Sequence, residues 1–402
     1  MDAARASIAD FPLVEIQASG TLAMKRKPTI TTIVCDASRT GAGMASVALT
    51  AHQRLGDRFD THLVTGLPPE QPLKNLHEAG SRGDGLKHLA PEVMSGIVHI
   101  HGLWTPFELR AYRLAKARGA KIVVSPHGAL EPWAFRSKRW KKLPAWYLYQ
   151  KAMLQNADLL VASTQIEHDN FRNQGLTAPI AILPVGIDVG EHDAATSVAV
   201  GQDREKVVLF LSRLSEKKGI PDLLQAWHDL TDRRGHQLHI HGYGTDAYRT
   251  FLESLVFSLD LSDSVQILGP LFDEEKWEKY RTSSIYVLPS YSENFGITVA
   301  EALLSGLPAI TTKATPWSEI VSVGIGWIIN NDVAQLRRAL EQAMSLDAEQ
   351  ISQMRERAGA YARSRFLWAP IIQQYAETYD WLLDPRRDMP SWVMRKDSRS
   401  LK

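Results

Sequence analysis

Short β-rich runs alternate with helix-like segments along most of the chain, and this alternation limits the possible folds more than any other feature. Because strands that alternate with helices form parallel sheets covered on both faces, the pattern predicts an α/β protein. The strand-like runs are residues 31–35, 61–65, 97–100, 121–125 and 159–162, then 207–211, 238–241, 265–268, 285–288 and 309–311. The helix-like segments between them are residues 106–118, 143–156, 219–232, 246–258, 273–282 and 297–305.

The alternation is interrupted once, near the middle of the chain. Residues 183–188 include a proline and a glycine, and residues 189–203 are polar and without periodicity, so this stretch is the best linker. A chain of 402 residues exceeds the usual size of one core. We therefore predict two doubly wound, Rossmann-like domains, residues 1–188 and 204–370. Such folds bind ligands at the carboxyl ends of their strands, so two halves facing each other predict an interdomain cleft.

Two segments follow the second domain. Residues 371–385 form an amphipathic helix that is expected to pack back on the first domain. Residues 386–402 are polar and basic and are expected to be a mobile tail.

Composition excludes several classes of protein. A net charge of +1 argues against a general nucleic-acid binder. Cys35 is the only cysteine, so an intrachain disulfide or a cysteine-rich zinc site is impossible, and a reducing cytoplasm is the natural compartment. The first 28 residues lack the apolar core of a signal peptide, and no stretch reaches transmembrane length without charges. The chain is expected to be soluble, or peripheral at a membrane.

A strand-to-helix turn at residues 285–304 carries the clearest chemical signal. Pro289 ends the strand, and Gly296 allows the bend before the helix, so Glu293 lies in the loop and Glu301 on the helix. The free amides at the helix start would attract phosphate, whereas carboxylates suit the adjacent hydroxyls of a sugar. The alternative is an ordinary surface acid and a glutamate that complements the helix dipole.

Cations follow an earlier strand of the second half. Arg213 can hold phosphate oxygens in a fork, and Lys218 can act as a point charge, so together they could neutralise a diphosphate. A solvated charged loop is the alternative, especially for Lys217. Glycine turns that could approach a ligand, or simply make tight turns, are weaker signals at Gly41, Gly43, Gly242 and Gly244.

Histidines end two strands of the first half. His99 and His101 share a face of a regular strand, so a metal pair is conceivable, but no third ligand stands at suitable spacing and a structural role is favoured. His127, which precedes a glycine, is the better donor to a ligand in the cleft. No metal is expected, because Arg213 and Lys218 already supply positive charge and no Asp-x-Asp pair appears in the sequence, and no cofactor is expected.

Basic and aromatic residues are interleaved between residues 133 and 142. Such clusters suit the headgroups of an anionic membrane or a lipid-diphosphate acceptor. The alternative is a solvated basic face above buried tryptophans. The residues concerned are Trp133, Arg136, Lys138, Arg139, Trp140, Lys141 and Lys142.

These pieces, in this order, resemble the GT-B glycosyltransferases of the retaining family 4 type, also called group 1, from about residue 30 to 383. The most specific matches are Arg213 with Lys218-Gly219, the segment 293–301, and residues 184–188. Two further segments look like a bacterial subgroup that acts on surface polysaccharides. They are Pro126-His127-Gly128 with Glu131-Pro132-Trp133, and Thr315-Pro316-Trp317 with Glu319 and Gly326-Trp327. The loop at residues 39–44 departs from the family by lacking a run of three glycines, and Val185 stands where asparagine is common.

Carried over by position, the resemblance implies a role for each matching residue. Glu301 would hold the nucleotide ribose, Glu293 would lie at the donor sugar, and Arg213 and Lys218 would bind the diphosphate. His127 would contact the donor sugar from the first domain, and Gly41 to Gly43 would approach donor or acceptor. Further donor contacts are implied for Asn294, Phe295, Gly296, Ile297, Thr298, Gly242 and Gly244.

The resemblance implies a retaining, metal-independent hexosyltransferase that uses a nucleotide-sugar donor, most often UDP- or GDP-linked. Its acceptor would be a glycan or a lipid-diphosphate saccharide in exopolysaccharide, O-antigen or lipopolysaccharide synthesis, at the inner face of the cytoplasmic membrane. The alternatives are an epimerase-like GT-B enzyme and a catalytically silent sugar-nucleotide-binding subunit. A dehydrogenase is disfavoured because neither half has the dinucleotide fingerprint.

Overall fold

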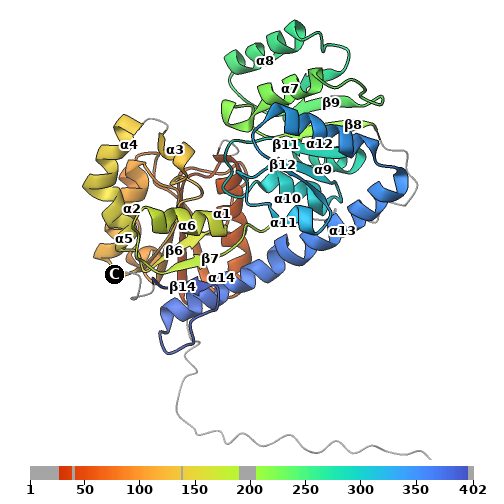
Figure 1. Cartoon of the computed structure of the whole chain (residues 1–402). Helices are drawn as coiled ribbons and strands as arrows, with labels where there is room; N and C mark the ends of the chain where they lie inside the picture. Colours follow the sequence, from red (N-terminus) through yellow and green to blue (C-terminus); the bar gives the residue numbers. More distant parts are fainter. Residues whose placement is uncertain (1–26, 39–40, 137–138, 190–204, 397–402) are drawn as a thin grey trace, which may run out of the picture.

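The computed structural model describes residues 27–38, 41–136, 139–189 and 205–396, which form two α/β domains (Figure 1). In the N-terminal sheet the strand order is β14-β7-β6-β5-β4-β1-β2-β3, and all neighbours are parallel except β14 and β7. These strands are β1 (Thr29–Asp36), β2 (Asp60–Leu67), β3 (Leu76–Glu78), β4 (Ile97–His101), β5 (Lys121–Ser125), β6 (Leu159–Ala162), β7 (Ile180–Ile182) and β14 (Val393–Met394).

The C-terminal sheet is parallel throughout, in the order β10-β9-β8-β11-β12-β13. The strand order reverses at β8 and β11, and in doubly wound sheets the ligand lies beside such a switch point. The prediction of two doubly wound domains is therefore confirmed. The strands are β8 (Val207–Leu211), β9 (Gln237–His241), β10 (Val265–Leu268), β11 (Ile285–Leu288), β12 (Ala309–Thr312) and β13 (Gly326–Ile329).

Helices connect the strands in both domains. Strands such as β8 and β11 are buried over their whole length, as expected for parallel strands that helices cover on both faces. The N-terminal helices are α1 (Ala42–Leu55), α2 (Pro106–Ala117), α3 (Pro132–Arg136), α4 (Arg139–Ala145), α5 (Lys151–Gln155) and α6 (Gln165–Asn173). The later helices are α7 (Ile220–His228), α8 (Asp246–Ser258), α9 (Asp273–Thr282), α10 (Ile297–Leu304), α11 (Glu319–Ser322), α12 (Val333–Ser345), α13 (Ala348–Phe366) and α14 (Trp368–Leu383).

The chain crosses between the domains twice, and the two crossings lie side by side. The amide of Ile187 donates a hydrogen bond to the carbonyl of Phe366 at 2.7 Å, and Ile187 pairs with Leu367 in a parallel bridge. A Cβ on Gly186 would stand 2.3 Å from the ring of Trp368, so only glycine allows this approach. Helix α14 then runs back along the N-terminal domain (Figure 1), where the Tyr379 hydroxyl lies 2.6 Å from His99 Nδ1.

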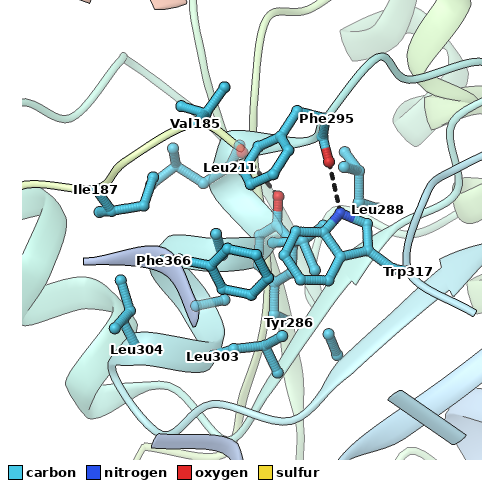
Figure 2. Close-up of a cluster of buried hydrophobic side chains, with 14 of the residues drawn as sticks. Val185, Ile187, Leu211, Tyr286, Leu288, Phe295, Leu303, Leu304, Trp317 and Phe366 are labelled. Carbon is cyan, nitrogen blue, oxygen red and sulfur yellow. Dashed lines mark hydrogen bonds between the residues drawn. The ribbon is translucent and has the colours of Figure 1, made fainter. Parts of the chain in front are cut away.

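A cluster of buried aromatic and aliphatic side chains joins these crossings to the loop before α10 (Figure 2). The ring of Phe295 lies 5.6 Å from the rings of both Trp317 and Phe366, and the Trp317 indole donates a hydrogen bond to the Phe295 carbonyl at 2.6 Å. Val185 and Ile187 belong to the same cluster. The loop that carries Glu293 therefore rests on the junction between the two domains.

The end of the chain differs from expectation. Residues from 386 onward were expected to form a mobile tail, whereas Val393 and Met394 pair with Ala181 and Ile180 as strand β14, and the Val393 side chain is buried. The buried valine and the neighbouring Trp392, whose indole donates a hydrogen bond to the Thr378 hydroxyl at 2.9 Å, hold this part of the chain in place. The linker predicted at residues 189–203 lies almost wholly outside the described residues. No helix in the described part of the chain is long and apolar enough to span a membrane.

Candidate active site

Lys218 and Glu293 form an ion pair at the carboxyl ends of two neighbouring strands, β8 and β11. The ammonium group contacts Glu293 Oε1, and the Ser290 hydroxyl donates to the same oxygen at 2.8 Å. The side chains of Lys218 and Glu293 are only 14% and 10% exposed. Two residues that lie 75 positions apart in the sequence thus share one largely buried site.

Gly219 makes this pairing possible. Its φ of +66° lies in the left-handed region, and a Cβ there would stand 2.3 Å from the carbonyl oxygen of Pro289. Because glycine has no Cβ, the loop that carries Lys218 can pack directly on the loop that carries Glu293. The Tyr291 amide bonds the two loops further, since it donates to the Lys217 carbonyl at 2.9 Å.

The N-terminus of α10 opens directly after this loop. Gly296 caps the helix with a φ of +78°. The amides of Gly296, Ile297 and Thr298 donate to no acceptor in the described part of the chain. The Thr298 hydroxyl lies 2.7 Å from the Tyr286 hydroxyl. Three free amides and the positive end of the helix dipole are suited to bind a phosphate.

Glu301 lies one turn further along α10 and is buried. Lys276 Nζ donates to one carboxylate oxygen at 2.6 Å, and the Tyr280 hydroxyl donates to the other at 3.0 Å. Burial and the nearby Glu301 carboxylate raise the pKa of Tyr280 well above its ordinary value, so the phenol keeps its proton. Lys276 and Tyr280 were missed from the sequence, because they come from α9 and no motif connects them to Glu301.

Arg213 follows β8 and is exposed. Its guanidinium lies 5.7 Å from the centre of the Tyr243 ring and has no carboxylate partner among the described residues. Gly242 and Gly244 let their loop pack closely on the loop that carries Arg213. A Cβ on Gly242 would stand 1.9 Å from the Ser212 carbonyl oxygen, and a Cβ on Gly244 would stand 2.6 Å from the Leu214 carbonyl oxygen. The two glycines therefore have a packing role, and their contact with a donor stays a prediction.

The three histidines predicted at strand ends, His99, His101 and His127, contact one another in series, and the ring centres of His99 and His101 lie 4.1 Å apart. His99 Nε2 lies 2.7 Å from the Ser125 hydroxyl, and His101 Nδ1 lies 2.8 Å from His127 Nε2. Burial disfavours the charged imidazolium, and it lowers the pKa of His99 to about 3 and that of His127 to about 4. His99 and His101 thus have structural partners, and the described residues include no group of three or more His, Cys, Asp or Glu suited to a metal ion.

His127 lies in a strained turn, and the Glu167 carboxylate holds the next residue, Gly128, in place. Its φ is +51°, and the next residue, Gly128, has a φ of +76°. The Gly128 amide donates to the Glu167 carboxylate at 2.7 Å, and that carboxylate also accepts from the Ser163 amide at 2.8 Å. Nδ1 of His127 has no partner in the described part of the chain, so this nitrogen is available to a ligand.

The turn at His127 meets the loop before α10 across the domain interface. A Cβ on Gly128 would stand 2.8 Å from Asn294 Cβ, and Asn294 Nδ2 donates to the Ser163 hydroxyl at 2.9 Å. At the start of α1, a Cβ on Gly43 would stand 2.9 Å from Ile297 Cδ1. Residues predicted from both halves of the sequence are thus brought together.

Two predicted donor residues have packing roles in this structure. The side chain of Phe295 points into the buried cluster of Figure 2, so only its backbone faces the start of α10, and its contact with a donor stays a prediction. Gly41 caps α1 and packs on the Asp36 carbonyl oxygen, which a Cβ would approach to 2.3 Å. Both positions were chosen from the motif, which does not show whether a residue contacts a ligand or packs inside the protein.

The basic and aromatic cluster divides into two parts. Trp133 stacks on Tyr291 of the other domain, with ring centres 5.9 Å apart and an angle of 15° between the planes. Trp140 is 75% exposed, so the alternative of tryptophans buried under a basic face is wrong for this residue. The Lys142 ammonium lies 5.6 Å from the centre of the Trp104 ring. Arg136, Arg139 and Lys141 are exposed, and Lys138 lies outside the described residues.

Known proteins resemble the chain in sequence and in structure. Residues 196–365 match the family model described as "Glycosyl transferases group 1", and residues 47–191 match the model "Glycosyltransferase Family 4". The GDP-mannose:cellobiosyl-diphosphopolyprenol alpha-mannosyltransferase of Xanthomonas oryzae pv. oryzae is 26% identical over 328 residues, which are 80% of this chain and 82% of the relative.

Two solved structures share the arrangement of both domains. Sucrose-phosphate synthase from Thermosynechococcus elongatus superposes with a TM-score of 0.71 at 18% identity, over 89% of this chain and 100% of that one. Anabaena HepE in complex with UDP-glucose superposes with a TM-score of 0.68 at 20% identity, over 88% and 99%. The fold is GT-B, and the chain belongs to the group 1, family 4 type of glycosyltransferases.

Proposed function

We propose that this glycosyltransferase is a retaining, metal-independent enzyme that moves a sugar from a UDP- or GDP-linked donor to a saccharide acceptor. The observation that carries the proposal is the group of three free amides at the start of α10, directly after the loop in which Glu293 pairs with Lys218. Amides at a helix terminus and a lysine together can hold a diphosphate. A catalytically silent binding subunit would need the same site, so activity has to be measured.

The diphosphate would change the partners of the charged residues. When phosphate oxygens bind Lys218, the Glu293 carboxylate is released from that ion pair and can accept a hydrogen bond from a sugar hydroxyl. Arg213, which has no carboxylate partner among the described residues, can turn toward the same phosphates. Stabilising the charge of the departing nucleoside diphosphate is the largest expected contribution to catalysis.

The reaction proposed here is balanced without a cofactor. The bond between the sugar C1 and the phosphate oxygen breaks, and the acceptor oxygen bonds to C1 on the same face. The acceptor proton passes to the departing phosphate oxygen, because no described side chain is a clear general base. Positive charge on the phosphates would come from Lys218, Arg213 and the α10 terminus, which supports activity without a metal ion.

A lipid-linked acceptor is supported by the exposed surface near α4. Trp140, Tyr147 and Leu148 are 75%, 77% and 80% exposed, and the exposed cations Arg139 and Lys141 flank Trp140 in the sequence. Helix α4 lies at the outer edge of the N-terminal domain (Figure 1). The diphosphopolyprenol in the name of the Xanthomonas relative supports an acceptor of this class. We further propose that the transfer serves surface-polysaccharide synthesis at the cytoplasmic face of a membrane.

The test is an assay with a panel of UDP- and GDP-sugars and no acceptor, with and without a chelator. We expect slow release of free sugar from one donor, unchanged by chelation, and the anomer first released should keep the donor's configuration in NMR spectra. Rapid conversion of the donor to an epimer would identify an epimerase. Binding without any turnover, also when acceptors are supplied, would identify a silent subunit, and loss of activity on chelation would disprove metal independence.

Membrane contact has a separate test. Sedimentation with vesicles of neutral or anionic lipid should bring down the protein only with anionic lipid, and the double variant Trp140→Ala/Leu148→Ala should stay in the supernatant. The variant Phe257→Ala is a matched control, because Phe257 is 81% exposed on α8 of the other domain. If the sedimented fraction of the protein is the same with neutral and anionic lipid, and the same for the double variant, this surface does not bind membranes.

A further inference from the structure

Glu131 reaches across the domain interface to both loops of the active site. It precedes α3 in the N-terminal domain, and its side chain is 5% exposed. Its Oε2 accepts hydrogen bonds from Lys217 Nζ at 2.9 Å and from the Ser292 hydroxyl at 2.6 Å. Each of these partners is adjacent in sequence to a member of the Lys218–Glu293 pair.

The two loops that Glu131 contacts, one after β8 and one before α10, are hydrogen-bonded to each other. The Tyr291 amide donates to the Lys217 carbonyl, and the Tyr291 hydroxyl donates to Asp222 at 2.6 Å, so the loop before α10 is tied to the loop after β8 and to the start of α7. Trp133, two residues after Glu131, stacks on Tyr291. The N-terminal domain therefore contacts the two bonded loops through the Glu131 carboxylate and the Trp133 ring.

Contact between the domains buries the Glu131 carboxylate against Lys217. A buried carboxylate is poorly hydrated, so it depends on a nearby cation and hydroxyl for compensation. While the domains are in contact, Lys217 and Ser292 replace the water that Glu131 has lost, so this arrangement depends on both partners. The ion pair thus links the approach of the domains to the position of the residues next to Lys218 and Glu293.

We propose that Glu131 is a positioning residue that couples closure of the two domains to the placement of Lys218 and Glu293. This inference rests on the proposed nucleotide-sugar transfer for its catalytic part only. The other carboxylate oxygen, Oε1, is buried without a donor in the described part of the chain and lies beside Gly128. A direct contact of Oε1 with a substrate hydroxyl is the competing role, and the experiment separates the two.

The experiment compares Glu131→Gln with the wild type. Glutamine keeps an oxygen for Ser292 but loses the charge that attracts Lys217. We expect kcat to fall at least about tenfold, equivalent to about 1.4 kcal/mol in the barrier, while the dissociation constant for the donor changes less than about threefold. The fraction of donor lost to hydrolysis rather than transfer should rise, because water enters a site that closes less completely.

Two further variants test the coupling. Glu131→Gln/Lys217→Met should be no slower than the single variant, and the charge reversal Glu131→Lys/Lys217→Glu should recover part of kcat. Glu205→Gln is the matched control, since it removes a lysine–carboxylate pair of 2.8 Å that lies within the C-terminal domain. It should leave kcat unchanged.

Small-angle X-ray scattering gives a readout that needs no activity. Glu131→Gln without ligand should have a larger radius of gyration than the wild type and the control. If no donor is turned over by the wild type but this expansion is seen, the proposed function fails and the role in closure holds. Unchanged scattering, or a loss of donor affinity as the main effect of Glu131→Gln, would overturn the positioning role.

Discussion

At the scale of single residues, the Lys218–Glu293 pair carries the largest electrostatic consequence. Because both side chains are largely buried, removing one leaves the other without compensation, which typically costs about 3–5 kcal/mol. We predict that Lys218→Ala and Glu293→Ala each destabilise the protein more than the double variant does. Urea unfolding measures this, and the half-exposed Arg337–Glu341 pair on α12 is the control, with an expected effect below about 1 kcal/mol.

Activity should not follow the same pattern as stability. Lys218→Ala removes a cation that would stabilise the leaving diphosphate, so we expect kcat to fall by about 10²–10³ and the double variant to recover none of it.

For stability, full additivity of the Lys218→Ala and Glu293→Ala effects on the free energy of unfolding would show that the two side chains do not form a coupled pair in solution.

The neutral histidines predict a dependence of stability on pH. The folded protein keeps His127 neutral down to its pKa of about 4, whereas the unfolded chain takes up a proton below the ordinary value of 6.5. Between these values the unfolded state binds more protons, so the free energy of unfolding should fall as pH falls, by at most about 1.4 kcal/mol per pH unit for each such histidine. His127→Gln should show a shallower fall from pH 6.5 to pH 4.5, and an unchanged slope would contradict the assignment.

The sequence allowed several single residues to be placed correctly. Glu293 was expected in a loop and Glu301 on a helix, and both positions agree with the structure, because Pro289 and Gly296 mark the boundaries locally. The partners of the two acids could not be predicted, since Lys276 and Tyr280 reach Glu301 only after α9 packs on α10. Side-chain partners depend on tertiary packing, which residue spacing does not encode.

At the scale of elements, Gly219 fixes how the loop after β8 meets the end of β11. We predict that Gly219→Ala destabilises the protein by more than the roughly 1 kcal/mol expected for the left-handed φ alone, because its Cβ would also collide with the Pro289 carbonyl. Gly119→Ala is the matched control, since Gly119 has a φ of +74° and open space around it. Thermal unfolding of both variants measures the difference, and equal losses would contradict a tight contact between the loops.

Longer elements were easier to predict than short ones. The strand-like runs at 207–211 and 285–288 coincide with β8 and β11, because buried parallel strands are continuous apolar runs. Strands β3, β7 and β14 have only two or three residues, too few to show a period, and they were missed. Helices α12 and α13 were also overlooked, although Asp332 and Asp347 cap their N-termini and signal their starts.

At the scale of the whole molecule, the two crossings and α14 unite the domains into one functional unit. The crossing at Gly186 packs on Trp368, and the cluster behind the α10 loop shares residues with this junction (Figure 2). A change in the angle between the domains would therefore move the loop that carries Glu293. The alternation of strands and helices predicted the two domains, but this junction arises from aromatic packing between segments about 180 residues apart.

The most direct test of the account is the contribution of the diphosphate to donor binding. Calorimetry should compare the nucleoside, its monophosphate and its diphosphate, in the uridine and guanosine series, with wild type and Lys218→Ala. The account predicts that in one series the dissociation constant falls at least about tenfold from nucleoside to diphosphate, and that Lys218→Ala removes most of this gain. Equal affinities for nucleoside and diphosphate in both series, or an unchanged gain in Lys218→Ala, would contradict a phosphate site at Lys218 and the α10 terminus.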